Sequence, residues 1–423
     1  MTEPVWADSD SLPGLIQRGR GACYDLASAQ REQAAKHVLD CIVHDPRWDH
    51  QVEDRSWLYA TLAAELSVDP KRFRAAYARP ADPHGDSDAW LAVGTLEHLA
   101  QADIDGSVGE LRHYLRTGRD LSLALGALLP FAEHVEARGL LHEVLEVADD
   151  EQLLSEARWV DLSASPWPQW RAGSARLDRI LDAAERHPNP EPTMRTRTER
   201  ETAERERVLA AAGEMRHVPA VAAATLSAEA WETMLLDVEP ELLADETVPW
   251  TARIAARNQL WKLRSPRART WAEVHADLEG EPGYTALSLL GDLGEQSDAP
   301  RLLEHLVAAH TGGDDYMYSQ CTLVAALRRL TYRPAIPIIE TVFDTTVYSY
   351  LRIRCAEALG CLSAEFTRTR AVECLTDCES STREIAISRV DLSIPRARER
   401  LARIAADPME EDENRRAAAA RIS

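Results

Sequence analysis

The chain has 423 residues, more than one compact hydrophobic core usually serves, so we expect several cores or one elongated, repetitive core. Only 6% of the residues are aromatic and the strong helix formers Ala, Leu, Arg and Glu dominate, which argues against an all-β fold. The 70 acidic and 48 basic residues give a formal charge of −22, which disfavours nucleic acid as a partner because phosphate recognition depends on basic side chains.

The sequence shows no signal for export or membrane insertion. Its first ten residues, MTEPVWADSD, carry three acids and no basic residue, and no apolar signal core follows them. No charge-free apolar run reaches the roughly 18 residues of a membrane span. Seven cysteines, an odd number, do not indicate a disulfide framework. We therefore expect a soluble protein of the cytoplasm.

In the N-terminal half, apolar positions recur every 32 to 33 residues, the spacing of a two-helix repeat. The matched positions are Trp57, Leu58, Leu62 and Leu66 with Trp90, Leu91, Leu96 and Leu99, then Leu91, Gly94 and Leu96 with Leu123, Gly126 and Leu128. Residues 91–118 predict two amphipathic helices joined by a short polar connection. Gly118 is placed to cap the second helix.

This periodicity stops between residues 187 and 207. Pro188, Pro190 and Pro192 forbid a helix there, and the run RTRTERETAERER that follows predicts a solvated helix supported by charge pairs at i,i+4. We therefore expect an N-terminal arc over 1–186, a proline-rich and charged linker over 187–207, and a C-terminal arc over 208–423. Residues 208–283 read as helical without a regular repeat.

The clearest repeat lies in the C-terminal half. LRIRCAEALGCL, residues 351–362, has small residues and an arginine at the positions typical of the second helix of a HEAT repeat, and SQCTLVAALRRL, residues 319–330, keeps the same frame 32 residues earlier. Residues 284–306 fit a further unit, with Asp298 as an N-cap. On these residues the chain resembles the HEAT-repeat family, including its phycobilin-lyase-like bacterial branch.

The resemblance covers residues 57–173 weakly and 284–406 well. It implies an all-α fold, an armadillo-like α-α superhelix or solenoid of antiparallel helix pairs, in which each pair buries its apolar face against the next. It is nearly silent on function, because such solenoids serve many unrelated roles.

The sequence offers little for metal or cofactor chemistry. Four cysteines, Cys355, Cys361, Cys374 and Cys378, fall close together but lack the CxxC spacing of structural zinc, so we interpret them as small buried residues at helix crossings. The common phosphate-loop, dinucleotide, nucleophile-elbow and HExxH signatures are absent. We expect no metal and no cofactor.

Two Tyr-x-Tyr steps form the first candidate binding surface. Tyr316 and Tyr318 precede one second helix, and Tyr348 and Tyr350 occupy the same repeat position 32 residues later. Equivalent positions of a solenoid form a ladder on one surface, commonly the concave one. With Asp315, Asp344 and Arg352, these tyrosines have the composition of a protein-binding surface. Alternatively, the tyrosines fill the core between repeats.

The densest tryptophan cluster gives a second candidate. Trp159, Trp167 and Trp170, with Asp161 and Arg171, resemble the lesion site of HEAT-like DNA glycosylases, which combine Trp and Asp in a basic groove. The negative charge argues against that use, and tryptophans filling gaps between stacked helices are the simpler interpretation.

Fold and charge together predict a non-catalytic scaffold whose concave face binds another protein or a peptide, with a basic partner favoured by the acidic chain. The alternative is an enzyme that works in the groove, either a DNA glycosylase or a lyase-like modification factor. The residues alone leave the question of catalysis open.

Overall fold

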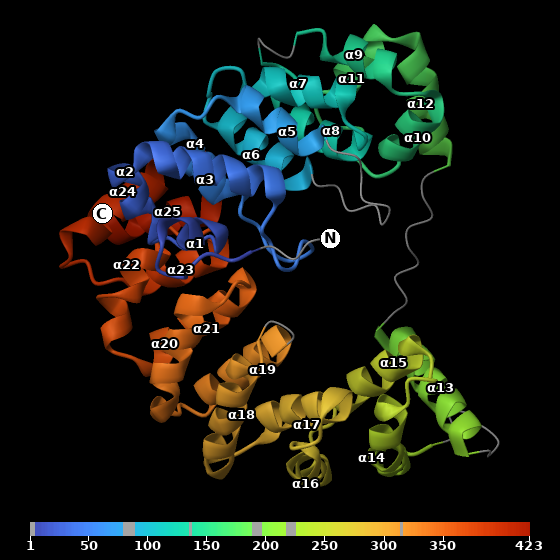
Figure 1. The fold of residues 1–423 in the computed structure, drawn as a ribbon. Helices are drawn as coiled ribbons and strands as arrows, with labels where there is room; N and C mark the ends of the chain where they lie inside the picture. Colours follow the sequence, from blue (N-terminus) through green and yellow to red (C-terminus); the bar gives the residue numbers. More distant parts are fainter. Residues whose placement is uncertain (1–4, 79–88, 135–137, 188–196, 217–225, 314–315) are drawn as a thin grey trace. The chain divides into compact units, whose positions relative to one another are not determined.

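The computed structural model describes residues 5–78, 89–134, 138–187, 197–216, 226–313 and 316–423 (Figure 1). Helices account for 74% of it, the described residues include no strand, and neighbouring helices pack in pairs. The predicted all-α class is therefore confirmed. None of the described helices is long and apolar enough to cross a membrane.

The chain divides into two compact units, each described by itself here. Unit 1 comprises residues 1–192, 344–356 and 364–423, and unit 2 comprises residues 193–343 and 357–363. The expected division into two continuous arcs differs from this one, because the last sixty residues belong with the N-terminal residues. The three prolines of the expected linker lie outside the described residues.

Unit 1 holds the first twelve α-helices and the last four. They are α1 (Leu12–Gln17), α2 (Cys23–Ala29), α3 (Arg31–His44), α4 (Ser56–Leu66), α5 (Arg74–Tyr77), α6 (Ala89–Gln101), α7 (Ser107–Thr117), α8 (Leu121–Leu128), α9 (Leu140–Val147), α10 (Asp150–Ala157), α11 (Trp167–Gly173), α12 (Ala175–Arg186), α22 (Arg370–Cys374), α23 (Ser380–Arg389), α24 (Pro395–Ala406) and α25 (Asp412–Ile422).

Unit 2 contains the helices that come between these two groups in the chain. The boundary between the units falls inside each of its last two helices. They are α13 (Arg197–Arg216), α14 (Ala228–Ala244), α15 (Trp250–Leu260), α16 (Pro266–His275), α17 (Gly280–Leu293), α18 (Ala299–Thr311), α19 (Met317–Arg329), α20 (Ile336–Thr345) and α21 (Ser349–Leu362).

The helices predicted from the repeats occur where the sequence placed them. Residues 91–118 form α6 and α7, and the N–H of Gly118 donates to the carbonyl of Tyr114 at the end of α7. Residues 284–306 lie in α17 and α18, with Asp298 as the N-cap of α18. Three- and four-residue apolar spacing explains why, since it gives each helix one buried face. On α12 that face carries Leu177, Ile180, Leu181 and Ala184.

Within unit 1 the N-terminal helices α1–α4 lie beside the C-terminal helices α22–α25 (Figure 1). The backbones approach closely: the N–H of Cys378 donates to the carbonyl of Gly19 at 3.0 Å. Gly19 has a φ of 68°, and a Cβ there would clash with the Cys378 sulfur, while a Cβ on Gly21 would clash with the Glu373 carbonyl. Glycine is therefore required at both positions of this seam.

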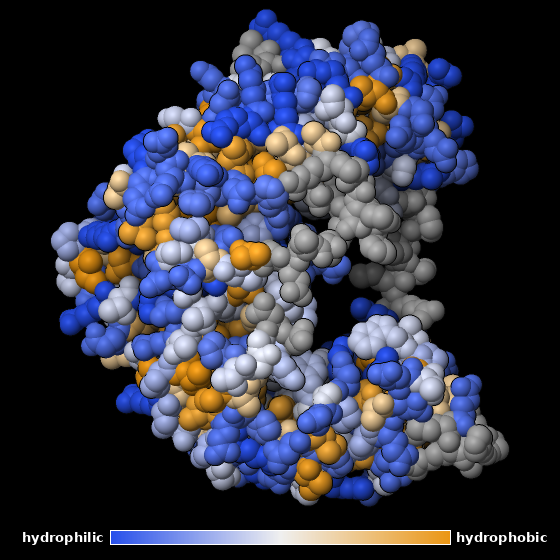
Figure 2. Space-filling model, in the orientation of Figure 1, coloured by the Kyte–Doolittle hydropathy of each residue, from blue (hydrophilic) through white to orange (hydrophobic). Residues whose placement is uncertain are grey.

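The face shown in Figure 2 is mostly hydrophilic, and its apolar residues form several small groups. Surfaces of this kind favour recognition through charge and local contacts over one extended apolar interface.

Candidate functional site

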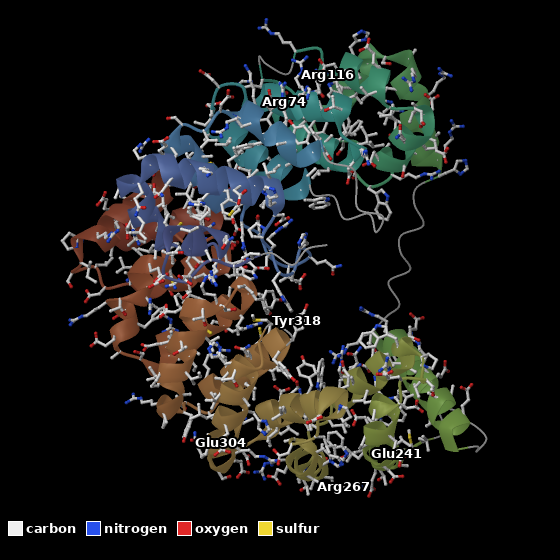
Figure 3. The ribbon with its side chains drawn as sticks, in the orientation of Figure 1. Arg74, Arg116, Glu241, Arg267, Glu304 and Tyr318 are labelled. Atoms are coloured by element: carbon white, nitrogen blue, oxygen red, sulfur yellow. The ribbon has the colours of Figure 1, made fainter. Side chains whose placement is uncertain are left out.

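The structure separates the residues of the predicted tyrosine surface. Tyr316 and Tyr318, at the start of α19 in unit 2, are 49% and 50% exposed, and Figure 3 labels Tyr318 at that end of the helix. Tyr348, in unit 1, is 1% exposed and packs on Trp48 with 4.8 Å between ring centroids. Tyr350 is half-buried, with the Arg354 guanidinium 4.8 Å from its ring. The core interpretation therefore holds for Tyr348.

Arg352 is also a core residue, which corrects its expected place on the binding edge. Its side chain is fully buried and donates two hydrogen bonds to Asp377, at 2.7 and 3.1 Å. Although burial disfavours the charge, the Asp377 carboxylate raises the pKa of the guanidinium well above its usual value. A partner cannot reach this side chain. Asp315 lies outside the described residues.

The tryptophan cluster is not assembled as a groove site. Trp167 and Trp170 are buried and pack edge to face at 5.6 Å, as expected of core residues, whereas Trp159 is 69% exposed. Asp161 lies in an exposed turn and accepts hydrogen bonds from the N–H and hydroxyl of Ser163, which lower its pKa. Its carboxylate is thus kept ionised in solvent, unlike a catalytic acid in a closed site.

Arg171 is likewise already paired with neighbouring acidic side chains. Its guanidinium forms ion pairs with Asp178, Asp182 and Glu185 of α12. The predicted alternative site therefore offers no unpaired cation for a nucleic-acid phosphate.

Three of the four clustered cysteines are buried as predicted, namely Cys355, Cys374 and Cys378, but Cys361 is exposed. Over the described part of the chain, no group of three or more His, Cys, Asp or Glu side chains is arranged to hold a metal ion.

A cleft of about 610 Å³ opens in unit 1 at the seam between the N-terminal segment and residues 344 and 370–373. That volume lies within the range of ligand-binding sites. Six of its nine lining residues are charged, namely Asp8, Asp10, Asp344 and Glu373 with Arg20 and Arg370. Ser9, Leu15 and Ala22 complete it.

Four of these side chains form a closed ring of ion pairs. Arg20 Nη2 lies 2.9 Å from Asp344 and 2.7 Å from Glu373. Arg370 reaches the same two carboxylates, at 2.6 Å and 3.2 Å. The ring is thus neutral in total. Because each carboxylate binds both guanidinium groups, the four side chains hold one another in place.

Local structure positions each part of the ring. Ser11 caps α1 by accepting a hydrogen bond from the N–H of Gly14, so Asp8 and Asp10 lie in the turn just before that helix. Arg20 follows α1 in the tight loop that contains Gly19 and Gly21. Asp344 lies in the last turn of α20, and Arg370 and Glu373 lie on the one short helix α22.

Asp8 and Asp10 add two exposed carboxylates to the neutral ring, so the cleft carries a net negative charge. Such a cleft attracts a cation of suitable size. A guanidinium or ammonium group on a flexible side chain matches this chemistry.

Among these residues the sequence predicted only Asp344. Arg20 and Glu373 are 353 residues apart, and no local pattern connects them. The close RGRG spacing around Arg20 was the available signal, because two glycines beside two arginines indicate a tight backbone approach. No protein-family model, curated protein or solved structure matches the chain.

Proposed function

We propose that the chain is a non-catalytic binding protein whose helix pairs belong to a HEAT-like superhelix, and that its unit 1 cleft takes a basic side chain of a partner protein. The net negative cleft around the ring of Arg20, Asp344, Arg370 and Glu373 carries this proposal. The formal charge of −22 supports it, since long-range attraction speeds encounter with a basic partner.

The two arginines of the ring favour a basic side chain over an anion. Both guanidinium groups already face two carboxylates each, so they have little attraction left for a phosphate. Asp8 and Asp10, by contrast, are exposed and stand at the cleft. A bound guanidinium would place its positive charge against them. In unit 2, taken by itself, Tyr316 and Tyr318 are exposed aromatic residues of the kind that suit contact with a protein.

Titration of a fluorescent hexa-arginine peptide tests the proposal by anisotropy at low and physiological salt. The variant Asp8→Asn plus Asp10→Asn removes two cleft charges and should weaken binding about two- to thirtyfold, at roughly 0.2–1 kcal/mol per exposed charge. Affinity should fall with rising salt, and a hexa-glutamate peptide should not bind.

The matched control is Glu151→Gln plus Glu304→Gln, which changes the net charge equally at exposed positions outside the cleft lining; Glu304 is labelled in Figure 3. It should alter the affinity less than twofold. Equal losses in the cleft and control variants would show that only the overall charge attracts the peptide, and the cleft proposal would be wrong.

A further inference from the structure

Two buried carboxyl groups meet at one hydroxyl group in unit 1. Ser349, the first residue of α21, donates its N–H to Glu53 Oε2 at 2.8 Å, and its Oγ lies 2.7 Å from the same oxygen. The Ser349 Oγ also makes a short hydrogen bond with Glu379 Oε1. Glu53 precedes α4 and Glu379 precedes α23, so the three residues join the N-terminal and C-terminal parts of the unit.

One hydroxyl group has one proton and can donate to only one of these carboxyl groups. The other contact requires a second proton between its two oxygens. Glu53 is the group that stays ionised: although burial favours its protonated form, Arg55 and the N–H groups of Asp49 and Ser349 lower its pKa. The second proton therefore lies on Glu379, which donates to Ser349 Oγ while Ser349 donates to Glu53.

The surroundings of Glu379 agree with this assignment. The side chain is 9% exposed, and burial, together with Asp377 and Glu53, raises its pKa to about 7. Arg352, the cation that acts to lower the Glu379 pKa, is already held by Asp377 at 2.7 Å. The charged groups that surround Glu379 are Glu53, Asp54 and Arg55 before α4, Arg352 on α21, Asp377, and Arg383 on α23, with Glu97 and His98 of α6 beyond Asp54.

We propose that Glu379, Ser349 and Glu53 form a proton-dependent latch, which holds the C-terminal helices of unit 1 against its N-terminal helices while Glu379 is protonated. Ionisation of Glu379 removes the donor to Ser349 and places two carboxylates on either side of one hydroxyl. In the dielectric of a buried site this repulsion is weakly screened. The seam therefore loosens as the pH rises toward neutrality.

The latch and the cleft share the same two parts of the chain. The cleft is lined by residues from the 8–22 segment together with Asp344, Arg370 and Glu373. The latch joins Glu53 to Ser349 and Glu379. Protonation therefore favours the form in which the cleft is complete. The latch itself does not depend on any ligand, so it can be tested without one.

Hydrogen exchange of the full chain, followed by mass spectrometry from pH 4.5 to pH 8.5, measures the latch directly. The protection factor, which corrects for the intrinsic pH dependence of exchange, is compared for peptides over 45–56 and 349–356. In the wild type it should fall between pH 4.5 and about 7, by up to tenfold per pH unit for a latch that opens with loss of one proton, and it should level off above pH 7, where Glu379 is ionised in the closed form as well. In Glu379→Gln, which keeps a donor but cannot ionise, it should stay constant.

Glu97→Gln is the matched control. Burial and Asp54 raise the pKa of Glu97 to about 6, but Glu97 does not share the Ser349 hydroxyl. This variant should keep the wild-type fall between pH 4.5 and about 7. Constant protection in the wild type across the range would overturn the proposal even if Glu379→Gln did not fold, and so would the same fall in Glu379→Gln as in the wild type.

Discussion

Replacing Glu239 by leucine is expected to stabilise unit 2, by an amount that grows as the pH rises. Glu239 lies on the buried face of α14, between Leu235 and Leu242, and is fully buried. Neither of its carboxyl oxygens has a hydrogen-bond partner among the residues that the structure describes. Burial, reinforced by the charge of Glu281, raises the pKa of Glu239 well above its ordinary value of 4.5.

The sign of the pH dependence follows from proton binding. Above pH 4.5 the unfolded chain releases the Glu239 proton, whereas the folded protein keeps it, so unfolding releases a proton and stability falls with rising pH. The cost is about 1.4 kcal/mol per pH unit until Glu239 ionises in the folded protein. Two units above 4.5 it reaches about 3 kcal/mol. Leucine also removes an unsatisfied polar group, which contributes about 1–3 kcal/mol at any pH.

Hydrogen exchange of the peptide covering α14 measures this stability within unit 2. The protection of Glu239→Leu relative to the wild type should be greater than one at pH 4.5 and should increase about tenfold per pH unit above it. Glu241→Leu is the control, because Glu241 is exposed on the same helix (Figure 3). Its ratio to the wild type should not change with pH.

Two results would refute the reasoning. A Glu239→Leu variant that is less stable than the wild type at every pH would mean that the carboxyl group has a bonding partner. A stabilisation that does not vary with pH would mean that Glu239 is ionised in the folded protein at ordinary pH.

Three further predictions concern residues that the sequence had singled out. Arg352→Met should destabilise unit 1 by about 3–5 kcal/mol in chemical unfolding, because Asp377 keeps a buried charge, and adding Asp377→Leu should recover most of the loss. Trp167→Ala should lower the free energy of unfolding by about 3–5 kcal/mol, because Trp167 is buried. Asp161→Asn, at an exposed turn, should change the free energy of unfolding by less than about 1 kcal/mol, and equal effects of the two variants would contradict the placement of Trp167 in the core. In native protein treated with a thiol reagent and analysed by peptide mapping, Cys361 should be modified first, since it is exposed. Faster modification of the buried cysteines would argue against the fold of this region.

Helix positions were accessible from the sequence because they depend on short-range spacing. The three- and four-residue apolar steps of α7 predict one buried face, and the glycine after α7 and the aspartate before α18 mark where those helices end and begin. The same local pattern could not tell a tyrosine at the surface from one in the core. Tyr316 and Tyr348 occupy the same predicted repeat position, yet Tyr316 is half exposed and Tyr348 is buried against Trp48.

The charged contacts of unit 1 were decided only by the tertiary structure. Arg352 was predicted to continue a binding edge, but it is buried because Asp377 lies 25 residues after it and the Gly19 carbonyl 333 residues before it. The ring at the cleft joins Arg20 to Asp344 and Glu373, and the latch joins Glu53 to Ser349 across 296 residues. Helical periodicity tells which side of a helix is buried, but an ion pair depends on which distant segment packs there. The sequence by itself thus determined the helices, and the meeting of the chain's two ends decided where its buried charges and its cleft lie.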